Sequence, residues 1–367
     1  MTAYLILIAG ALYLVELAFY SLAGRKARKP RKGPFPFQKL PKVSVVVAAK
    51  DEEENLQACL ESLVSVDYPR DLLEIVVVND QSADGTPAII DRVAGEYGFV
   101  RRIDAVEGTD MRGKANALSQ GIDRAQGEFI FLTDADCTVP VTWISGTLKH
   151  FEEKTGIVGG VTLISKTDNV LSGIQSLDWD FLLSIGSAAA TIGKPLACLG
   201  NNLAFRKKAY EDVGGYRKIR FSVTEDYALF KAIAESGRWD YRYPMDRQTL
   251  VETLPLGTLK EVFAQRKRWA TGGKDTGLFG VLTLAPGFLF HWSMIVTAIL
   301  APAMFPLLLL LKLLLDALFV FPVLKFYGKI VHLKFIVYFE IYYLIYVAIL
   351  PFSVYLGKAI TWKGRKY

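Results

Sequence analysis

Long apolar stretches at both ends of the chain limit what it can fold into, because each is long enough to cross a bilayer. Residues 1–23 are almost uninterrupted apolar sequence, followed by a basic run from Arg25 to Lys32. A cleavable signal carries its positive charge before the apolar run, so this order predicts a retained transmembrane anchor (residues 1–23) with its basic flank in the cytoplasm. We therefore predict an integral membrane protein.

Two further apolar blocks lie in the last third of the chain. The first runs from about Leu282 to Leu324, which is long enough for one tilted span with an interfacial piece or for two short spans. The second runs from about Phe335 to Leu356 and precedes a basic tail, residues 358–367. Because basic residues prefer the cytoplasm, we favour two spans in residues 282–357 and three crossings in all, with four as the alternative that puts the tail outside.

The composition argues against nucleic-acid binding and against a zinc site. The net charge of +6 is concentrated in the segments that flank the apolar blocks, where it suits anionic lipid headgroups, and no nucleic-acid-binding module is visible. The three cysteines, Cys59, Cys137 and Cys198, form no CxxC pair and are expected to be reduced and buried. The three histidines, His150, His291 and His332, are scattered without the spacing of zinc ligands.

The middle of the chain alternates short β-branched runs with helical stretches. The runs are Val43–Val47, Ile75–Val78 and Phe129–Leu132, and the helical stretches are residues 53–64, 86–97 and 114–125. This alternation predicts an α/β domain (residues 41–256) with a doubly wound sheet, which binds ligands beyond the carboxyl ends of its strands. Residues 24–40, rich in proline and basic side chains, are expected to be a stiff linker from the anchor.

Acidic residues follow two of these strands directly. Asp80 comes after the second run, and Asp134 and Asp136 come after a later one. Two carboxylates two positions apart at a strand end can hold Mg²⁺ or Mn²⁺ and leave coordination positions for phosphate oxygens and water. The alternatives are a helix cap at Asp80 and a solvated acidic turn at Asp134 and Asp136.

Basic residues appear at two predicted helices. Lys114 follows a glycine at a helix start, where free backbone N–H groups favour phosphate, although a lysine there is commonly just a solvated surface residue. The stretch Leu259–Thr271 mixes apolar and cationic positions, Arg266 and Arg268 among them, which predicts an amphipathic helix at the headgroup level within residues 257–281. Its Gln265 and Trp269 are four apart and share a face.

Five motifs in a fixed order resemble those of the membrane-bound family 2 glycosyltransferases, which include cellulose and hyaluronan synthases and ceramide glucosyltransferase. They are Asp51-Glu52, Asn79 to Thr86, Asp134-Ala135-Asp136, Thr224-Glu225-Asp226 and Gln265-Arg266-Lys267-Arg268-Trp269. The resemblance covers roughly residues 42–273 and implies a GT-A type, Rossmann-like nucleotide-sugar domain with flanking transmembrane helices. The chain departs from the common pattern at Lys50-Asp51, where Tyr-Asn is frequent, and at Asn79 and Gln81, where Asp and Gly are.

The resemblance also implies a role for each motif. Asp136 is the firmer metal ligand, Asp134 shares metal and nucleotide contacts, and the base of a uridine nucleotide lies against Ala49, Glu52 and Asp80. Lys114 and Arg268 face the diphosphate, and Trp269 lies in the acceptor pocket. Gln265 is counted with Arg268 and Trp269 among the catalytic residues, and Asp226 is the general base. A base that takes the acceptor proton as the hydroxyl attacks the anomeric carbon opposite the leaving group inverts that carbon.

Together these features predict inverting, metal-dependent transfer of a hexose from a nucleotide sugar, expected to be a UDP-sugar, to a lipid acceptor. We expect the catalytic domain in the cytoplasm, as at the inner membrane of a bacterium, and the oligomeric state stays open. The rival enzyme is a processive polysaccharide synthase, against which the small number of spans argues, and the non-enzymatic rival is an inactive scaffold.

Three smaller expectations concern single segments. The resemblance places residues 198–202 at a glycine-containing acceptor loop, and residues 172–194 are expected to form a mobile segment over the acceptor entrance. Lys312 and Asp316 lie four apart in an apolar block and are expected to pair on one helical face.

Overall fold

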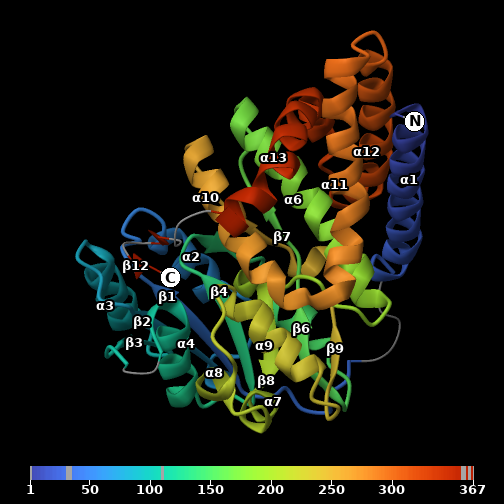
Figure 1. Cartoon of the computed structure of the whole chain (residues 1–367). Helices are drawn as coiled ribbons and strands as arrows, with labels where there is room; N and C mark the ends of the chain where they lie inside the picture. The colour runs from blue at the N-terminus through green and yellow to red at the C-terminus, as the bar shows by residue number, and fades with distance from the viewer. Residues whose placement is uncertain (1, 30–34, 109–110, 357–360, 363–364, 367) are drawn as a thin grey trace. The chain divides into compact units, whose positions relative to one another are not determined.

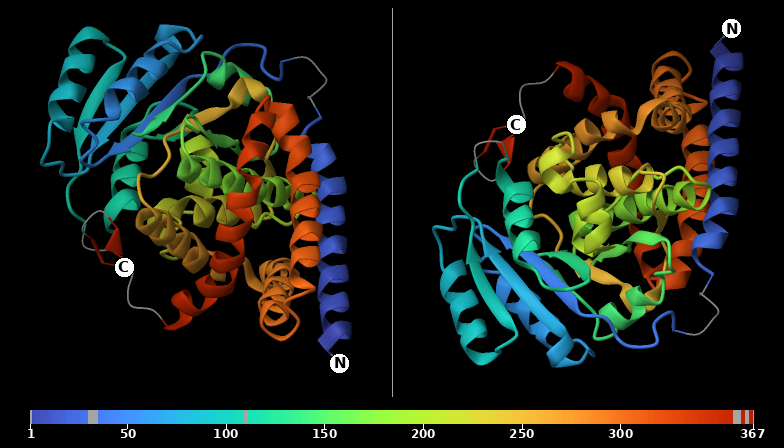
Figure 2. Two further views of the ribbon diagram at one scale, coloured as in Figure 1. Left: turned by 90° about the horizontal axis from the view of Figure 1, so that it is seen from above. Right: turned by 90° about the horizontal axis from the view of Figure 1, so that it is seen from below.

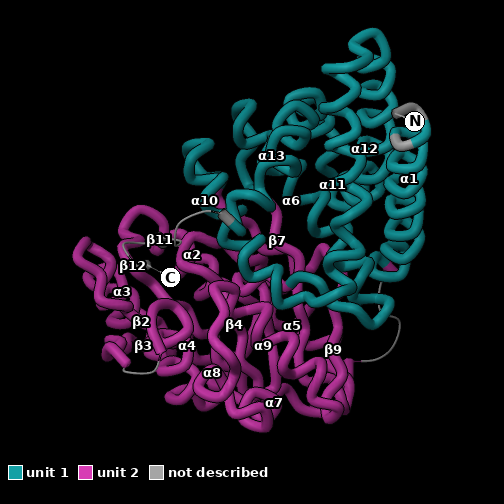
Figure 3. Tube along the Cα trace, in the orientation of Figure 1, with its two compact units in different colours: residues 1–28, 164–197, 255–367 teal, residues 29–163, 198–254 magenta. Residues whose placement is uncertain are grey.

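The computed structural model describes residues 2–29, 35–108, 111–356, 361–362 and 365–366. It divides into two compact units (Figure 3). The sheet unit consists of residues 29–163 and 198–254, and the helical unit consists of residues 1–28, 164–197 and 255–367. Residues 164–197, which fall inside the predicted 41–256 domain, therefore cluster with the helices. Residues 30–34 of the predicted linker and residues 358–360, 363–364 and 367 of the predicted tail lie outside the described residues, and residues 24–27 of the linker belong to the first helix.

The sheet unit is built on seven strands in the order β3-β2-β1-β4-β8-β6-β9 (Figure 1). Strands β3, β2, β1 and β4 run parallel, whereas β8 is antiparallel to both of its neighbours, so the sheet is mixed. The bounds are β1 Val43–Ala49, β2 Leu73–Asn79, β3 Val100–Asp104, β4 Phe129–Asp134, β6 Thr155–Gly159, β8 Leu203–Arg206 and β9 Asp240–Arg242.

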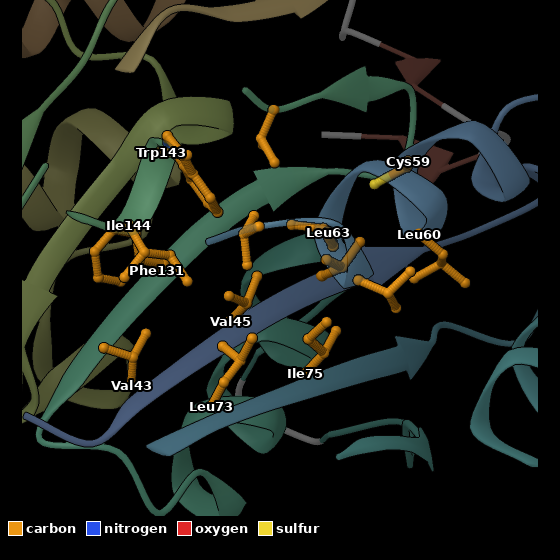
Figure 4. Close-up of a cluster of buried hydrophobic side chains, with 14 of the residues drawn as sticks. Val43, Val45, Cys59, Leu60, Leu63, Leu73, Ile75, Phe131, Trp143 and Ile144 are labelled. Atoms are coloured by element: carbon orange, nitrogen blue, oxygen red, sulfur yellow. The ribbon is translucent and has the colours of Figure 1, made fainter. Parts of the chain in front are cut away.

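Helices cover both faces of the parallel half, as β-branched runs without polar alternation require. On one face Val45, Val47 and Ile75 pack in the core that contains the apolar side chains of α2 (Leu56–Val64) and α3 (Thr86–Glu96). Figure 4 shows Val45 and Ile75 in this core together with Leu60 and Leu63 of α2. On the other face lies α4 (Gly113–Arg124), whose Gly121 comes so close that an added Cβ would lie 2.6 Å from Val46 Cγ1. The predicted doubly wound arrangement is confirmed for these strands.

The other elements of the sheet unit are short. Strands β5 (Cys137–Thr138), β10 (Val251–Thr253) and β7 (Thr162–Ile164) form a small sheet in the order β5-β10-β7. The helices are α5 Trp143–Leu148, α7 Lys207–Asp212, α8 Gly215–Lys218 and α9 Glu225–Ala234, with 3₁₀ turns η1 Arg70–Leu72, η2 Gly200–Asn202 and η3 Arg247–Thr249. All three cysteines lie in this unit and are buried and free, as expected.

The helical unit joins segments that are far apart in the sequence. Its elements are α1 Thr2–Ala27, α6 Val170–Thr191, α10 Leu259–Gly272, η4 Gly273–Thr276, α11 Gly277–Leu300, α12 Phe305–Tyr327, η5 Ile330–Phe335, α13 Ile336–Leu356, β11 Thr361–Trp362 and β12 Arg365–Lys366. Helix α1 packs against α6 and α11, and in both views it lies beside helices from the last third of the chain (Figure 2). The shared core is rich in aromatic side chains, including Tyr13, Phe181, Phe290, Phe319 and Phe339.

Four helical regions of the described chain are long and apolar enough to span a membrane: Ile6–Ala27, Leu259–Leu300, Phe305–Tyr327 and Ile330–Tyr355. Helices α11 and α12 are separate because the chain turns at residues 301–304, where Pro302 lies. The four candidates match the alternative count of four rather than the favoured three, and the number of crossings stays a prediction.

Three buried charged side chains of the helical unit, Lys312, Asp316 and Glu340, form ion pairs with one another. Lys312 Nζ donates to Asp316 Oδ2 at 2.6 Å, which confirms the expected pair, and it also donates to Glu340 of α13. Tyr13 of α1 donates to Asp316 Oδ1 at 2.6 Å. These bonds join α1, α12 and α13, and they compensate charges that would otherwise be costly in an apolar surrounding.

The expectation of a mobile segment at residues 172–194 is wrong. Most of this segment belongs to α6, a 22-residue helix that is buried along most of its length and begins with a capping box at Asn169 and Ser172. It contacts α1, α12 and α13. The small residues of the run Ser187 to Ala190 are buried, where they allow close helix packing rather than a lid.

Candidate active site

The carboxyl ends of β1, β2 and β4 meet at one edge of the sheet and carry the predicted donor-site residues. Ala49 pairs in register with Asn79, and Ala48 pairs with Asp134. The backbone N–H of Asp80 donates to the Ala49 carbonyl at 2.8 Å. The structure therefore brings Ala49, Asp80 and Asp134 to one place, as the strand order predicted.

Two loops at this edge hold an unusual backbone conformation. Asp51 and Gln81, which follow β1 and β2, have φ of 51° and 59°, values that side chains other than glycine rarely adopt. Asp51 Oδ1 accepts from Ala83 N at 2.8 Å, and Glu53 Oε2 accepts from Gly85 N at 2.7 Å. Such strain persists where the surroundings fix it, which is common at ligand sites. Glu52 lies within the first loop and is half-buried.

Asn79, one of the departures from the family pattern, has a clear role in the loop after β2. Its side-chain amide donates to Asp104 Oδ1 at 2.7 Å, and its oxygen accepts from Ser82 N at 3.1 Å. Asn79 thus joins the end of β3 to the loop that carries Asp80. An amide suits this contact because its nitrogen donates while its oxygen accepts, whereas an ionised aspartate could only accept.

Asp134 and Asp136 lie at the end of β4 and in the turn that leads to β5. Burial, together with the charges of Asp134 and Glu52, raises the pKa of Asp136 to about 6. Carboxylates gathered in this way favour a cation. Within the described chain no group of three or more His, Cys, Asp or Glu side chains is arranged to hold a metal. A divalent cation held by Asp134 and Asp136 would have phosphate oxygens and water as its remaining ligands.

Lys114 pairs with this acidic cluster, while 34% of its side chain remains exposed. Gly113, with φ of 65°, turns the chain into α4, and Lys114 Nζ then lies 2.5 Å from Asp134 Oδ1 and 3.5 Å from Glu225 Oε1. Burial alone would lower the pKa of Lys114, but Asp134 and Glu225 outweigh it and raise the pKa above its ordinary value. Lys114 thus stays charged. The sequence analysis did not identify Glu225 as a partner of Lys114, and the structure adds it to the site.

Asp226 is held in a defined orientation at the start of α9. Its Oδ2 accepts from Gly200 N at 2.7 Å, and its Oδ1 accepts from Tyr227 N at 2.7 Å. The donor Gly200 belongs to residues 198–202, so the segment that the resemblance placed at the acceptor lies directly against Asp226. The charge of Asp226 also acts on Lys114, which places the predicted base and the predicted cation site in one electrostatic cluster.

Gln265, Arg268 and Trp269 lie on α10, in the helical unit. The predicted helix at Leu259–Thr271 is observed at Leu259–Gly272 and begins with a capping box between Thr258 and Glu261. Gln265, Arg268 and Trp269 are half-buried.

Arg266 departs from the expectation that it lies among the headgroups. It is 1% exposed and its Nε donates to Asp178 Oδ2 at 2.5 Å. A sequence signal for this pair was the presence of Asp178 and Asp180 in a largely apolar helix, because a buried carboxylate is costly without a partner.

Comparisons with known proteins agree with this fold. Residues 44–214 match the model of Glycosyl transferase family 2. The chain is 28% identical to a probable glycosyltransferase, YdaM, of Bacillus subtilis over 247 residues. It is 30% identical to a poly-β-1,6-N-acetyl-D-glucosamine synthase of Staphylococcus epidermidis over 243 residues. Each match covers 65% of this chain and 56% of the relative, so the chain spans little more than half the length of these relatives.

A solved structure has a similar fold over almost the whole chain. It is the mannosyltransferase PcManGT from Pyrobaculum calidifontis in complex with GDP-Man and Mn²⁺, with a TM-score of 0.66 and 21% identity. The similarity covers 93% of this chain and 99% of that one. It confirms the GT-A type architecture that the motif order predicted.

Proposed function

We propose that this chain, whose residues 44–214 match the model of Glycosyl transferase family 2, transfers a hexose from a UDP-sugar to a hydroxyl of a membrane lipid, with inversion at the anomeric carbon. The observation that carries the proposal is the position of Asp226. Its carboxylate is fixed by Gly200 N and Tyr227 N, and its charge acts on Lys114, which pairs with Asp134. A base and a cation site within one cluster are what this displacement needs.

The donor would bind at the carboxyl ends of β1, β2 and β4. Ala49, Glu52 and Asp80 would contact the nucleotide base, and Asp134 and Asp136 would hold Mn²⁺ or Mg²⁺. That cation would neutralise the charge that develops on the diphosphate. Support comes from the raised pKa of Asp136 and from the mannosyltransferase of similar fold, which was solved with a nucleotide sugar and Mn²⁺.

The transfer step would use Asp226 as the proton acceptor and the cationic side chains of Lys114 and Arg268 as partners of the diphosphate. Asp226 would accept the proton of the acceptor hydroxyl while that oxygen attacks the anomeric carbon from the face opposite the diphosphate. Lys114, kept charged by its carboxylate neighbours, would turn towards the diphosphate oxygens, and Arg268 would contact the same group. Gln265 and Trp269 would hold the acceptor.

The lipid acceptor is supported by the helical unit. Its four apolar candidate spans suit a protein that meets its acceptor in the bilayer. Described residues of its core are largely aromatic and apolar, which does not suit a polar channel for a sugar polymer. A cytoplasmic active site is supported by basic residues that follow α1 and by Lys325, Lys329 and Lys334 around the α12–α13 junction.

A second candidate is a processive polysaccharide synthase. The observation that favours it is the 30% identity to a poly-β-1,6-N-acetyl-D-glucosamine synthase, although that match covers 56% of the relative. The two candidates share donor chemistry and base, and they differ in whether the product leaves after one transfer.

Substitution of the base tests the shared part of the proposal. In detergent-purified protein, Asp226→Asn should keep donor binding while lowering transfer from UDP-sugar by about two to four orders of magnitude, as is typical for loss of a positioned base. Asp71→Asn, which makes the same change at an exposed residue of η1, is the control and should keep wild-type turnover. Near-normal transfer by Asp226→Asn would exclude Asp226 as the base.

A further inference from the structure

Arg266 and Asp178 form a buried ion pair between α10 and α6. Arg266 is 1% exposed and Asp178 is 0% exposed, and Arg266 Nε lies 2.5 Å from Asp178 Oδ2. Taking two charges out of water is expensive, and an apolar pair of similar volume often stabilises a fold as well or better. The pair is therefore poorly explained by stability alone, and the neighbours of Arg266 suggest another role.

Those neighbours are two residues of the Gln265 to Trp269 motif. Arg266 Nη1 donates to Gln265 Oε1 at 2.5 Å, and the guanidinium lies 4.3 Å from the centre of the Trp269 ring. Trp179, next to Asp178 on α6, meets Trp269 edge to face with ring centres 5.1 Å apart. One guanidinium thus contacts both Gln265 and Trp269, while Asp178 holds that guanidinium from the other helix.

We propose that Asp178 and Arg266 are positioning residues that orient Gln265 and Trp269 towards the acceptor; this rests on the proposed transferase function. Asp178 fixes the plane of the guanidinium, and because the guanidinium is rigid and planar, its N–H groups then point in fixed directions. Because Gln265 Oε1 accepts from Arg266, the amide is oriented so that its Nε2 is the group that donates to a substrate oxygen. The Trp269 ring is fixed by the cation over it and by the edge of Trp179.

Arg266→Lys tests this without leaving Asp178 unpaired. Lysine keeps the charge but lacks the planar fork that reaches Gln265 and stacks on Trp269. We expect the half-saturating lipid concentration to rise about tenfold, with the KM for UDP-sugar unchanged, since a misplacement of about 1 Å costs up to 10²-fold. The assay follows radiolabelled sugar from UDP-sugar into all products while a total membrane lipid extract is varied.

Arg206→Lys is the matched control. Arg206 also has a carboxylate partner, Glu128 at 3.1 Å, and also lies over an aromatic ring, that of Phe129 at 4.7 Å. It lies at the end of β8, and its other hydrogen bonds go to the backbone carbonyls of Thr155 and Glu152, outside the five motifs. Both KM values should therefore stay at wild-type level. A merely structural loss would instead lower the yield of folded protein and affect donor and lipid alike.

The double variant Gln265→Ala/Arg266→Lys tests whether Arg266 acts by positioning Gln265 or contributes to transfer independently of Gln265. If Arg266 acts through Gln265, adding Arg266→Lys to Gln265→Ala should reduce transfer by less than about threefold, because contacting residues of one unit are not additive. A full, multiplicative tenfold loss would overturn the part of the inference that concerns Gln265, and an unchanged lipid dependence in Arg266→Lys would overturn the inference as a whole. Absence of transfer in the wild type would instead refute the proposed function.

Discussion

Gly200→Ala should displace the proposed base without touching the donor site. A Cβ at residue 200 would lie 2.9 Å from both Cβ and Oδ2 of Asp226, whereas ordinary contacts are 3.4–4 Å. The Asp226 carboxylate must therefore move by roughly 0.5–1 Å, and its bond from Gly200 N must lengthen or bend. A misplacement of about 1 Å at a reacting group costs on the order of 10²-fold in rate. We expect kcat/KM to fall by about 10- to 100-fold.

The donor affinity should stay the same, because the residues proposed to contact the nucleotide base and the metal lie at or just after the carboxyl ends of β1, β2 and β4 rather than on η2. Initial rates at saturating UDP-sugar and an equilibrium measurement of UDP binding separate the two effects. Gly95→Ala is the control, since a Cβ there meets nothing within 4 Å. Overpacking costs roughly 1–3 kcal/mol, so thermal unfolding of both variants checks that the fold is kept.

Turnover of Gly200→Ala within about threefold of wild type would refute the idea that residue 200 fixes the base. It would also show that the Asp226 side chain tolerates displacement, which a positioned general base does not. A loss of UDP binding equal to the loss of rate would contradict the separation of donor and base sites.

Three further predictions concern metal, pH and topology. Chelation should abolish transfer and added Mn²⁺ or Mg²⁺ should restore it; full activity in chelator would exclude a metal at Asp134 and Asp136. The pKa of Asp136 is raised from 3.8 to about 6 in the folded protein. Ionisation of Asp136 therefore lowers the free energy of unfolding of the metal-free protein by up to about 3 kcal/mol. This loss is absent below about pH 4 and complete above about pH 6. Bound Mn²⁺ must displace that proton, so its effect on Tm should grow from pH 5 to pH 7 in the wild type; an equal growth in Asp136→Asn would contradict the assignment. In sealed cells, an impermeant thiol reagent should label Ala303→Cys in the α11–α12 turn and not Lys334→Cys, against a background of buried native cysteines; the reverse pattern would invert the proposed orientation.

The sequence predicted the parallel half of the sheet well, because its signals are local. Continuous β-branched runs such as Val43–Val47 suit strands that are covered on both faces, and the observed strand differs by only two residues at its end. The acidic residues after β2 and β4 were predicted to meet, because the carboxyl ends of neighbouring parallel strands share an edge. That expectation is confirmed by the register of Ala49 with Asn79 and of Ala48 with Asp134.

What the sequence did not predict depends on contacts between distant segments. The pair of Asp178 with Arg266 and the bond from Gly200 to Asp226 join residues that no periodicity connects. Residues 172–194 were expected to form a mobile segment because of their position in the chain, yet their small side chains allow α6 to pack closely against other helices. The antiparallel strand β8 carries no signal of its direction within its own residues.

The identity of the product tests the central proposal most directly. Purified protein is given a radiolabelled UDP-sugar, Mn²⁺ and a total membrane lipid extract, and the products are partitioned between organic solvent and water. We predict discrete, organic-soluble products that carry one or two sugars in inverted, β linkage from an α-linked donor, and none with Asp226→Asn. Long water-soluble polymer made without added lipid would contradict lipid transfer and establish the synthase in its place.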